Sequence, residues 1–243
     1  MPNPPAAVPD EAEVVVTYEN RIGWQVPAQK KGARPEIPQD EDFPVQRQPI
    51  AGRETLMAIA DFGKAYPLAV ATLPGLGTPE PPSIVSLLPK SAQKEGAKPV
   101  FCGFLPSSSD FELILLSEQG RIKRLARSEF TELSNRGLTA VKLKDGDRLQ
   151  QVSLAKVGQQ VAIATTGGRV LRFALSDSQL PVMGRNAQGT QALRLRTEEQ
   201  IVGLACHNPE DELVLVSQLG YGKRLTAREL RLASRGDIGT QAV

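Results

Sequence analysis

Cysteine, histidine and aromatic residues are scarce in this 243-residue chain, and each scarcity argues against a class of protein. It has two cysteines, one histidine and 5% aromatic residues. Cys102 and Cys206 lie far apart in sequence, so we expect two reduced thiols rather than a disulfide framework. The lone His207 offers too few partner ligands for a metal site, and we expect it in a surface loop. β-Branched residues, leucine and alanine must therefore build most of the core.

Long apolar runs and a strong net charge are missing as well. No apolar run approaches the roughly 20 residues of a membrane-spanning helix, so we expect a cytoplasmic protein with no membrane partner. The formal net charge of +2 neither supports nor excludes a nucleic-acid partner, because a basic stripe can lie within a balanced total. Residues 1–12 are proline-rich and lack the basic and apolar regions of a signal peptide, so we expect a disordered leader.

The chain contains instead a repeated pair of short strands. In residues 111–130 an apolar run meets a polar turn at Gly120 and resumes as the alternating run RIKRL, which is typical of a β-hairpin. The same pattern recurs with turns near residues 20, 63, 120, 168 and 220. Residues 84–88 are predicted to form a further strand, whereas residues 35–48 and 91–98 are predicted to be irregular.

A second pattern follows the last three hairpins. Residues 136–143, 184–195 and 235–243 resemble one another, and each combines an arginine, a glycine and a short predicted strand; we call them the echo segments. The repeat of roughly 50 residues, with about four short strands each, favours an all-β propeller-like ring. In such a ring the neighbouring sheets protect each other's edges.

Lysine and arginine gather on the second strand of most hairpins. We call these residues the post-turn cations, and they are Lys64, Arg121, Lys123, Arg124, Arg169, Arg172, Lys223 and Arg224. The echo segments add Arg136, Arg185 and Arg235. One face of each hairpin is expected to pack while the other holds positive charge in water.

Equivalent charges on equivalent units would form a belt that a DNA backbone could follow. Phosphate contacts of this kind are independent of sequence and sensitive to salt. Because no aromatic residues are interleaved with the cations, duplex DNA is favoured over single strands. The alternative interpretation is that these cations are ordinary solvated residues beside β-turns.

The repeats resemble the C-terminal DNA-wrapping domain of the A subunit of bacterial DNA gyrase, or of its topoisomerase IV counterpart. The matching pieces are SEQGRIKRL, TTGGRVLRF, MGRNAQGTQALRL and SQLGYGKRLTARELRLASRGDIGTQAV. The resemblance covers residues 13–243 and implies an all-β β-pinwheel. Such a domain is a propeller-like ring of about five to six four-stranded blades, with strands exchanged between neighbouring blades.

The resemblance also implies a function. The domain would be non-catalytic and would bind and wrap duplex DNA around a basic rim, serving strand passage by a type IIA topoisomerase with gyrase-type supercoiling. The implied partners are double-stranded DNA, the catalytic core and the B subunit, in the cytoplasm and associated with the nucleoid. No cofactor is expected in this chain, because ATP and Mg²⁺ belong to other parts of the enzyme. None of Tyr18, Tyr66 and Tyr221 is expected to cleave DNA, since all three lie in hairpins.

Two departures from the family leave alternatives open. Residues 29–35 occupy the place of the family's basic box, but Ala33 and Pro35 replace two of its glycines. Lys30, Lys31 and Arg34 remain as DNA-binding candidates, or as part of a basic tether. A sixth repeat is missing, so the ring is expected to lack its last blade. The alternatives are a topoisomerase IV-type domain with weak wrapping, or a free-standing propeller used for protein interaction.

Overall fold

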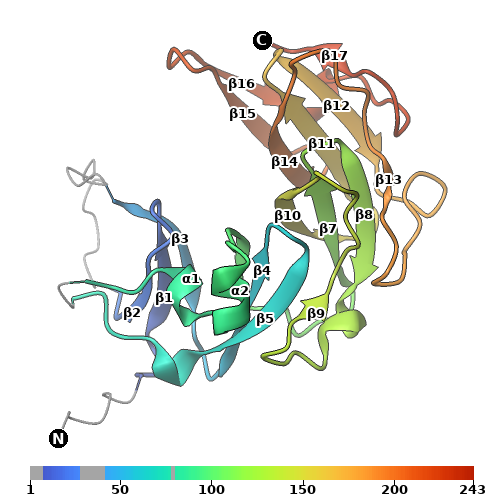
Figure 1. The fold of residues 1–243 in the computed structure, drawn as a ribbon. Coiled ribbons are helices and arrows are strands. Elements are labelled where there is room, and N and C mark those ends of the chain that lie inside the picture. The colour runs from blue at the N-terminus through green and yellow to red at the C-terminus, as the bar shows by residue number, and fades with distance from the viewer. Residues whose placement is uncertain (1–7, 28–41, 78–79) are drawn as a thin grey trace, which may run out of the picture. The chain divides into compact units, whose positions relative to one another are not determined.

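A computed structural model describes residues 8–27, 42–77 and 80–243, and within them most regular structure is β-strand. The prediction of an all-β chain is confirmed, and Figure 1 shows the strands gathered in short sheets. Five hairpins lie where the turn spacing predicted them. One residue at each turn has a left-handed backbone, which glycine and asparagine adopt most readily. Its φ angle is 60° at Asn20, 84° at Gly63, 78° at Gly120, 72° at Gly168 and 82° at Gly220.

The five hairpins follow one another along the chain, and the two strands of each are antiparallel. They are β1 (Glu13–Thr17) with β2 (Ile22–Gln25), β4 (Thr55–Ala60) with β5 (Lys64–Ala69), β7 (Phe111–Ser117) with β8 (Arg121–Ala126), β11 (Gln160–Thr165) with β12 (Arg169–Ala174), and β15 (Glu212–Val216) with β16 (Gly222–Thr226).

Later parts of the chain complete the second, third and fourth hairpins. An outer strand pairs with the first strand of each hairpin: β6 (Pro99–Gly103), β10 (Leu149–Lys156) or β14 (Ile201–His207). A two-residue strand from an echo segment lies beside the second strand: β9 (Leu138–Thr139), β13 (Thr190–Gln191) or β17 (Thr240–Gln241). Each echo segment follows the next hairpin in the chain, so the predicted exchange of strands is confirmed.

Three sheets therefore have four strands, in the orders β6-β4-β5-β9, β10-β7-β8-β13 and β14-β11-β12-β17. The first hairpin carries only β3 (Pro44–Pro49), in the order β2-β1-β3, and the last sheet is the hairpin β15-β16 alone. Within the described residues, the predicted count of five to six four-stranded blades is not confirmed.

Local structure differs from the prediction in two places. Residues 84–88 were predicted as a strand, but α1 (Ile84–Leu87) is a helix whose first turn is capped by the Ser83 hydroxyl, which accepts a hydrogen bond from the Ser86 N–H at 3.3 Å. A short apolar run does not by itself distinguish helix from strand. The predicted irregular stretches contain α2 (Lys90–Lys94) and β3, whose two prolines stand at the ends of an edge strand.

Three short 3₁₀ helices complete the regular structure of the described residues: η1 (Val70–Thr72), η2 (Arg127–Phe130) and η3 (Ala227–Glu229). The chain divides into two compact units. The first comprises residues 1–60, 65–105 and 133–138, and the second comprises residues 61–64, 106–132 and 139–243. Among the described residues, the helices are all too short or too polar to cross a membrane.

The core of the second unit forms where consecutive hairpins face each other. Ile114 and Leu116 of β7 are fully buried in a cluster with Phe173 of β12. On the opposite side of the fourth hairpin, Ala162 and Val170 pack in a second cluster with Leu225 of the fifth hairpin. Each of these clusters thus joins one hairpin to the next along the chain.

Candidate nucleic-acid interface

Four of the eight post-turn cations are buried, so the prediction that these side chains stand in water is wrong for them. The residue exposures are 1% for Lys123, 3% for Arg124, 2% for Arg169 and 6% for Arg172. Both faces of the third and fourth hairpins are buried along nearly the whole length of their strands. The alternation of apolar and basic residues along a strand therefore does not distinguish a solvent-exposed face from a buried face. Basic residues recur at equivalent positions of the hairpins partly because they form hydrogen bonds and ion pairs inside the protein, and not only because of a role at the surface.

Arg169 holds the third echo segment in place. Its guanidinium donates to the carbonyl of Ile238, just before β17, and to the carbonyl of Arg194 at 3.2 Å. It also forms a two-pronged ion pair with Glu199, and both side chains are almost fully buried. Glu199 accepts further hydrogen bonds from the Thr165 hydroxyl at 2.6 Å and the Arg196 N–H at 2.9 Å. These donors, Arg169 first, lower the pKa of Glu199 to about 2.

Lys123 likewise holds two echo segments in place. Its Nζ donates to the carbonyls of Ala140 at 2.7 Å, Arg185 at 2.7 Å and Ala187 at 3.2 Å. Three carbonyls satisfy the three N–H donors of an ammonium group, but they carry no net negative charge. Burial lowers the pKa of Lys123 to about 8, although the charge of Glu129 opposes this.

A diagonal pair recurs on three hairpins, between an arginine of the second strand and a polar residue near the start of the first strand. Arg124 donates to Glu112 at 2.5 and 3.1 Å, and Arg224 lies 3.4 Å from Glu212. In the fourth hairpin the partner of Arg172 is Gln160, at 3.2 Å. The buried Nε of Arg172 has no hydrogen-bond partner among the described residues, and burial lowers the pKa of this arginine.

The remaining post-turn cations reach the surface to different degrees. Arg121 is half-buried and donates to the carbonyls of Gln188 at 3.3 Å and Gly189 at 2.5 Å, so it too holds an echo segment. Lys64 is half-buried, with its ammonium 5.7 Å from the centre of the Phe62 ring. Lys223 and Arg224 are exposed.

The echo segments present three further accessible cations among those predicted. Arg136 and Arg185 are exposed, and the Arg185 Nε lies 3.0 Å from Glu129. Arg235 is half-buried, and its guanidinium donates to the carbonyl of Gln191 at 2.7 Å. Lys30, Lys31 and Arg34 lie outside the described residues.

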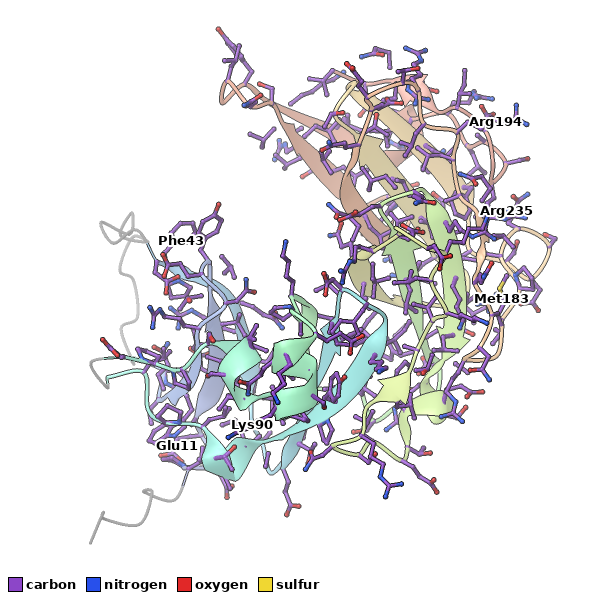
Figure 2. All side chains as sticks on the ribbon, in the orientation of Figure 1. Glu11, Phe43, Lys90, Met183, Arg194 and Arg235 are labelled. Atoms are coloured by element: carbon purple, nitrogen blue, oxygen red, sulfur yellow. The ribbon has the colours of Figure 1, made fainter. Side chains whose placement is uncertain are left out.

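Sequence reasoning missed four exposed cations in or beside two echo segments. Lys142 and Lys144 occupy the run KLK, and Arg194 and Arg196 occupy the equivalent run RLR. In both runs the two basic residues are exposed while the leucine between them is half-buried. Figure 2 shows Arg194 and Arg235 on the same side of the second unit. Comparing the echo segments residue by residue would have revealed this repeat of charge.

The remaining residues that the sequence singled out are the histidine and the two cysteines. The expectation of a surface-loop histidine is wrong, because His207 is buried at the end of β14 with Nδ1 2.9 Å from the Asn208 carbonyl. Cys102 and Cys206 are free thiols, as expected. Within the described residues, no cluster of histidine, cysteine and carboxylate side chains could hold a metal ion.

Comparison with known proteins identifies the class to which this arrangement of exchanged hairpins belongs. The family described as the DNA gyrase C-terminal domain, a beta-propeller, matches residues 112–156, 159–208 and 211–243. The chain belongs to this family, which confirms the resemblance seen in its repeats.

Relatives of both predicted kinds are found. The chain is 39% identical over 246 residues to the A subunit of DNA topoisomerase 4 from Synechocystis sp., an alignment that covers 97% of this chain and 26% of that protein. It is 30% identical over 207 residues to the A subunit of DNA gyrase from Staphylococcus epidermidis, covering 82% of this chain and 22% of that protein. The chain thus spans about a quarter of the length of these relatives.

A solved structure shares the fold. The C-terminal domain of DNA topoisomerase IV aligns with a TM-score of 0.74 and 17% identity, covering 95% of this chain and 72% of that chain. At this level of identity the likeness concerns the fold alone.

Proposed function

We propose that this domain binds duplex DNA without regard to sequence, through the exposed cations of its echo segments. The observation that carries the proposal is the repetition of exposed basic residues in equivalent segments, at Lys142 and Arg194 and at Lys144 and Arg196. Phosphate oxygens are the natural partners of such cations. Membership of the gyrase C-terminal family supports the same interpretation.

Three of the post-turn cations that are buried or half-buried stabilise the proposed binding surface. Arg121, Lys123 and Arg169 donate to main-chain carbonyls of the echo segments and so hold them in position. Exposed cations held on an ordered backbone lose less conformational entropy when they bind phosphate than cations on loose loops. The basic residues of the repeat thus divide into internal anchors and external contacts.

In a complete enzyme the domain would act as a non-catalytic DNA-binding part of a type IIA topoisomerase. Its partners would be the catalytic core and the B subunit, with ATP and Mg²⁺ used elsewhere, in the cytoplasm near the nucleoid. Bending DNA around the domain costs several kcal/mol, which multiple phosphate contacts must offset. The 39% identity to a topoisomerase 4 relative, against 30% to a gyrase relative, favours a topoisomerase IV-type role with weak wrapping.

The test is duplex binding as a function of salt, by fluorescence anisotropy with two unrelated 40-base-pair sequences. The parent chain should bind both equally, with an affinity that falls steeply as salt rises. A variant with Lys142→Glu, Arg185→Glu and Arg194→Glu should bind at least tenfold more weakly at low salt. If all three residues contact phosphate, the slope of log K against log salt should fall in magnitude by about 2.7, since each contact contributes about 0.9.

A matched control carries Lys90→Glu, Lys94→Glu and Lys98→Glu, which change the net charge equally on and beside α2. It should retain most of the affinity of the parent. Undetectable duplex binding by the parent at low salt, or equal losses in both variants, would contradict the assignment. Relaxing and ligating a nicked circle with the domain bound would then show, from the linking number, whether the domain wraps DNA or only binds it.

A further inference from the structure

Two loops of the second unit present apolar side chains to solvent at equivalent positions. Val182 lies in the loop after the fourth hairpin and Leu232 in the loop after the fifth, and they are 45% and 51% exposed. Each comes two residues after a buried leucine, Leu180 or Leu230. We call Val182 and Leu232 the apolar pair.

The backbone around the apolar pair is fixed in the same way in both loops. Val182 forms a parallel bridge with Arg124 of β8, and Leu232 forms one with Arg172 of β12. In each loop the N–H of the following residue donates to the carbonyl of that arginine, at 2.9 and 2.8 Å, respectively. Because their backbone is already ordered, the two side chains lose little conformational entropy when a partner covers them.

The fold does not require an apolar side chain at this position. In the first hairpin the equivalent bridge joins Trp24 to Gly75, and the Leu76 N–H donates to the Trp24 carbonyl at 2.9 Å. A glycine therefore occupies the same place in the backbone with no side chain at all. Single exposed apolar residues are common on protein surfaces, so the informative observation is their recurrence at two equivalent positions.

The two loops are tied to each other. The Arg235 guanidinium donates to the carbonyl of Gln179, at the start of the first loop, and the Arg235 N–H donates to the Gln179 side chain at 2.8 Å. Figure 2 shows Met183, the residue after Val182, on the same side of the second unit as Arg235 and Arg194. The loops that carry the apolar pair therefore lie on the side of this unit that presents exposed cations.

The composition of the two loops fits a partner that combines anionic groups with apolar surface. Residues 180–190 contain Arg185 and no carboxylate, and residues 230–239 contain two arginines and one carboxylate, Asp237. That carboxylate already pairs with Arg231 at 2.8 Å. The backbone of duplex DNA is a partner of this kind, because its phosphates alternate with deoxyribose rings.

Deoxyribose and ribose differ at an atom that an apolar contact would sense. Ribose carries a 2′-hydroxyl, and RNA duplexes display these hydroxyls along the minor groove. An apolar side chain packed on C2′ of deoxyribose removes apolar surface from water, which is favourable. The same side chain packed on ribose buries a hydroxyl without a hydrogen-bond partner, which is unfavourable. Phosphate contacts cannot make this distinction, since both nucleic acids carry the same phosphates.

We propose that the apolar pair packs on deoxyribose rings along the minor groove of bound duplex DNA and makes the domain select DNA over RNA. The inference rests on the proposed DNA binding, because the exposed cations bring the duplex to this side of the unit. The cations supply most of the affinity and its dependence on salt. Val182 and Leu232 supply an apolar contribution that changes little with salt and that ribose does not allow.

The test compares duplex DNA and duplex RNA of one 40-base-pair sequence, by fluorescence anisotropy over a range of salt concentrations. The parent chain should bind the DNA more tightly. A variant with Val182→Ser and Leu232→Ser should bind DNA about tenfold more weakly, or about threefold for each side chain, and RNA within about twofold of the parent. The slope of log K against log salt should not change, because no phosphate contact is removed.

A matched control carries Val157→Ser and Leu219→Ser, which replace one valine and one leucine that are 64% and 84% exposed outside the two loops. The control should bind both nucleic acids as the parent does. The melting temperatures of both variants should equal that of the parent, since all four side chains are exposed.

Equal losses for DNA and RNA in the Val182→Ser, Leu232→Ser variant, or an equal loss in the control, would overturn the inference. Unchanged DNA binding would also overturn it, and an accompanying change of self-association in sedimentation would assign the apolar pair to a protein interface. A smaller salt slope in the variant would attribute the loss to displaced cations and overturn the inference as well. Undetectable DNA binding by the parent would instead contradict the proposed function on which the inference rests.

Discussion

Arg169 and Glu199 form a buried, two-pronged ion pair that links the start of β12 to the loop before β14. The pair also lies within hydrogen-bonding reach of the third echo segment through the Ile238 carbonyl. Removing one partner of a buried pair leaves the other as an uncompensated charge. The pair therefore connects the fourth hairpin to the segment that supplies its exchanged strand.

The first prediction concerns this pair. Glu199→Gln should lower the free energy of unfolding by about 3–5 kcal/mol, as expected when a buried ion pair is broken. Urea denaturation followed by circular dichroism measures the change. Glu198→Gln, one residue away and exposed, is the matched control and should change stability by less than about 0.5 kcal/mol.

Acid should weaken the same pair over a defined range of pH. The pKa of Glu199 is about 2 in the folded chain and 4.5 when unperturbed. A lowered pKa means that the unfolded chain takes up a proton first, so the contribution to stability is complete above about 4.5 and is lost as the pH falls toward 2. The acid-dependent loss of stability should be smaller in Glu199→Gln. Parallel curves for the two proteins would contradict the pairing.

Lys123 predicts a second rise of stability with pH, at alkaline pH. Its pKa is lowered from 10.5 to about 8, so between these values the unfolded chain binds more protons than the folded chain. The Lys123 contribution therefore makes stability rise with pH from about 8 to 10.5. Urea midpoints measured across this range should show the rise in the parent and not in Lys123→Met. A rise of the same size in the variant would assign it to other groups.

Two glycines with the same backbone conformation should respond differently to alanine. Gly189 has φ of 75°, and an added Cβ would lie 2.5 Å from the Ile122 carbonyl oxygen. Gly146 has φ of 74° with nothing within 4 Å. Gly146→Ala should cost about 1 kcal/mol for the left-handed backbone alone. Gly189→Ala should cost about 1–3 kcal/mol more, because the echo segment must move away from β8. Equal losses in urea denaturation would show that the close approach is not maintained.

The fourth hairpin offers a stabilising substitution. Arg172 faces Gln160 where the equivalent arginines face Glu112 and Glu212. Gln160→Glu should place a carboxylate beside a buried guanidinium and raise stability by about 1–2 kcal/mol. The reciprocal change, Glu112→Gln, should destabilise the third hairpin. A neutral or destabilising Gln160→Glu would show that desolvation of the new carboxylate outweighs its attraction to Arg172.

The hairpins were predictable because their signals are local. A turn glycine flanked by apolar runs, as at Gly120 and Gly168, specifies a hairpin whatever surrounds it. Burial of the post-turn cations was not predictable in the same way. Whether Lys123 meets water depends on residues about 60 positions later, Arg185 and Ala187, whose carbonyls cover it.

The distinction between local signals and contacts between repeats also explains the other differences between the predicted and the observed structure. The run at residues 84–88 is helical because Ser83 caps it, and a strand-like composition could not reveal this. The exposed cations Lys142 and Arg194 were predictable in principle, since the echo segments repeat them at equivalent positions, but the hairpins carry the denser and more conspicuous charge. Local sequence patterns thus predicted most of the strands and turns, whereas contacts between repeats determine which charged side chains are exposed to solvent.

The exchange of strands also has a consequence for synthesis on the ribosome. Arg121 meets its partners Gln188 and Gly189 only across 67 and 68 residues of sequence. A hairpin that has just left the exit tunnel must therefore wait for the whole following repeat to be translated before its last strand arrives. Such non-local pairing is slow and leaves strand edges open in the meantime. Nascent chains of this kind should depend on translation speed and on chaperones more than a chain of self-contained hairpins would.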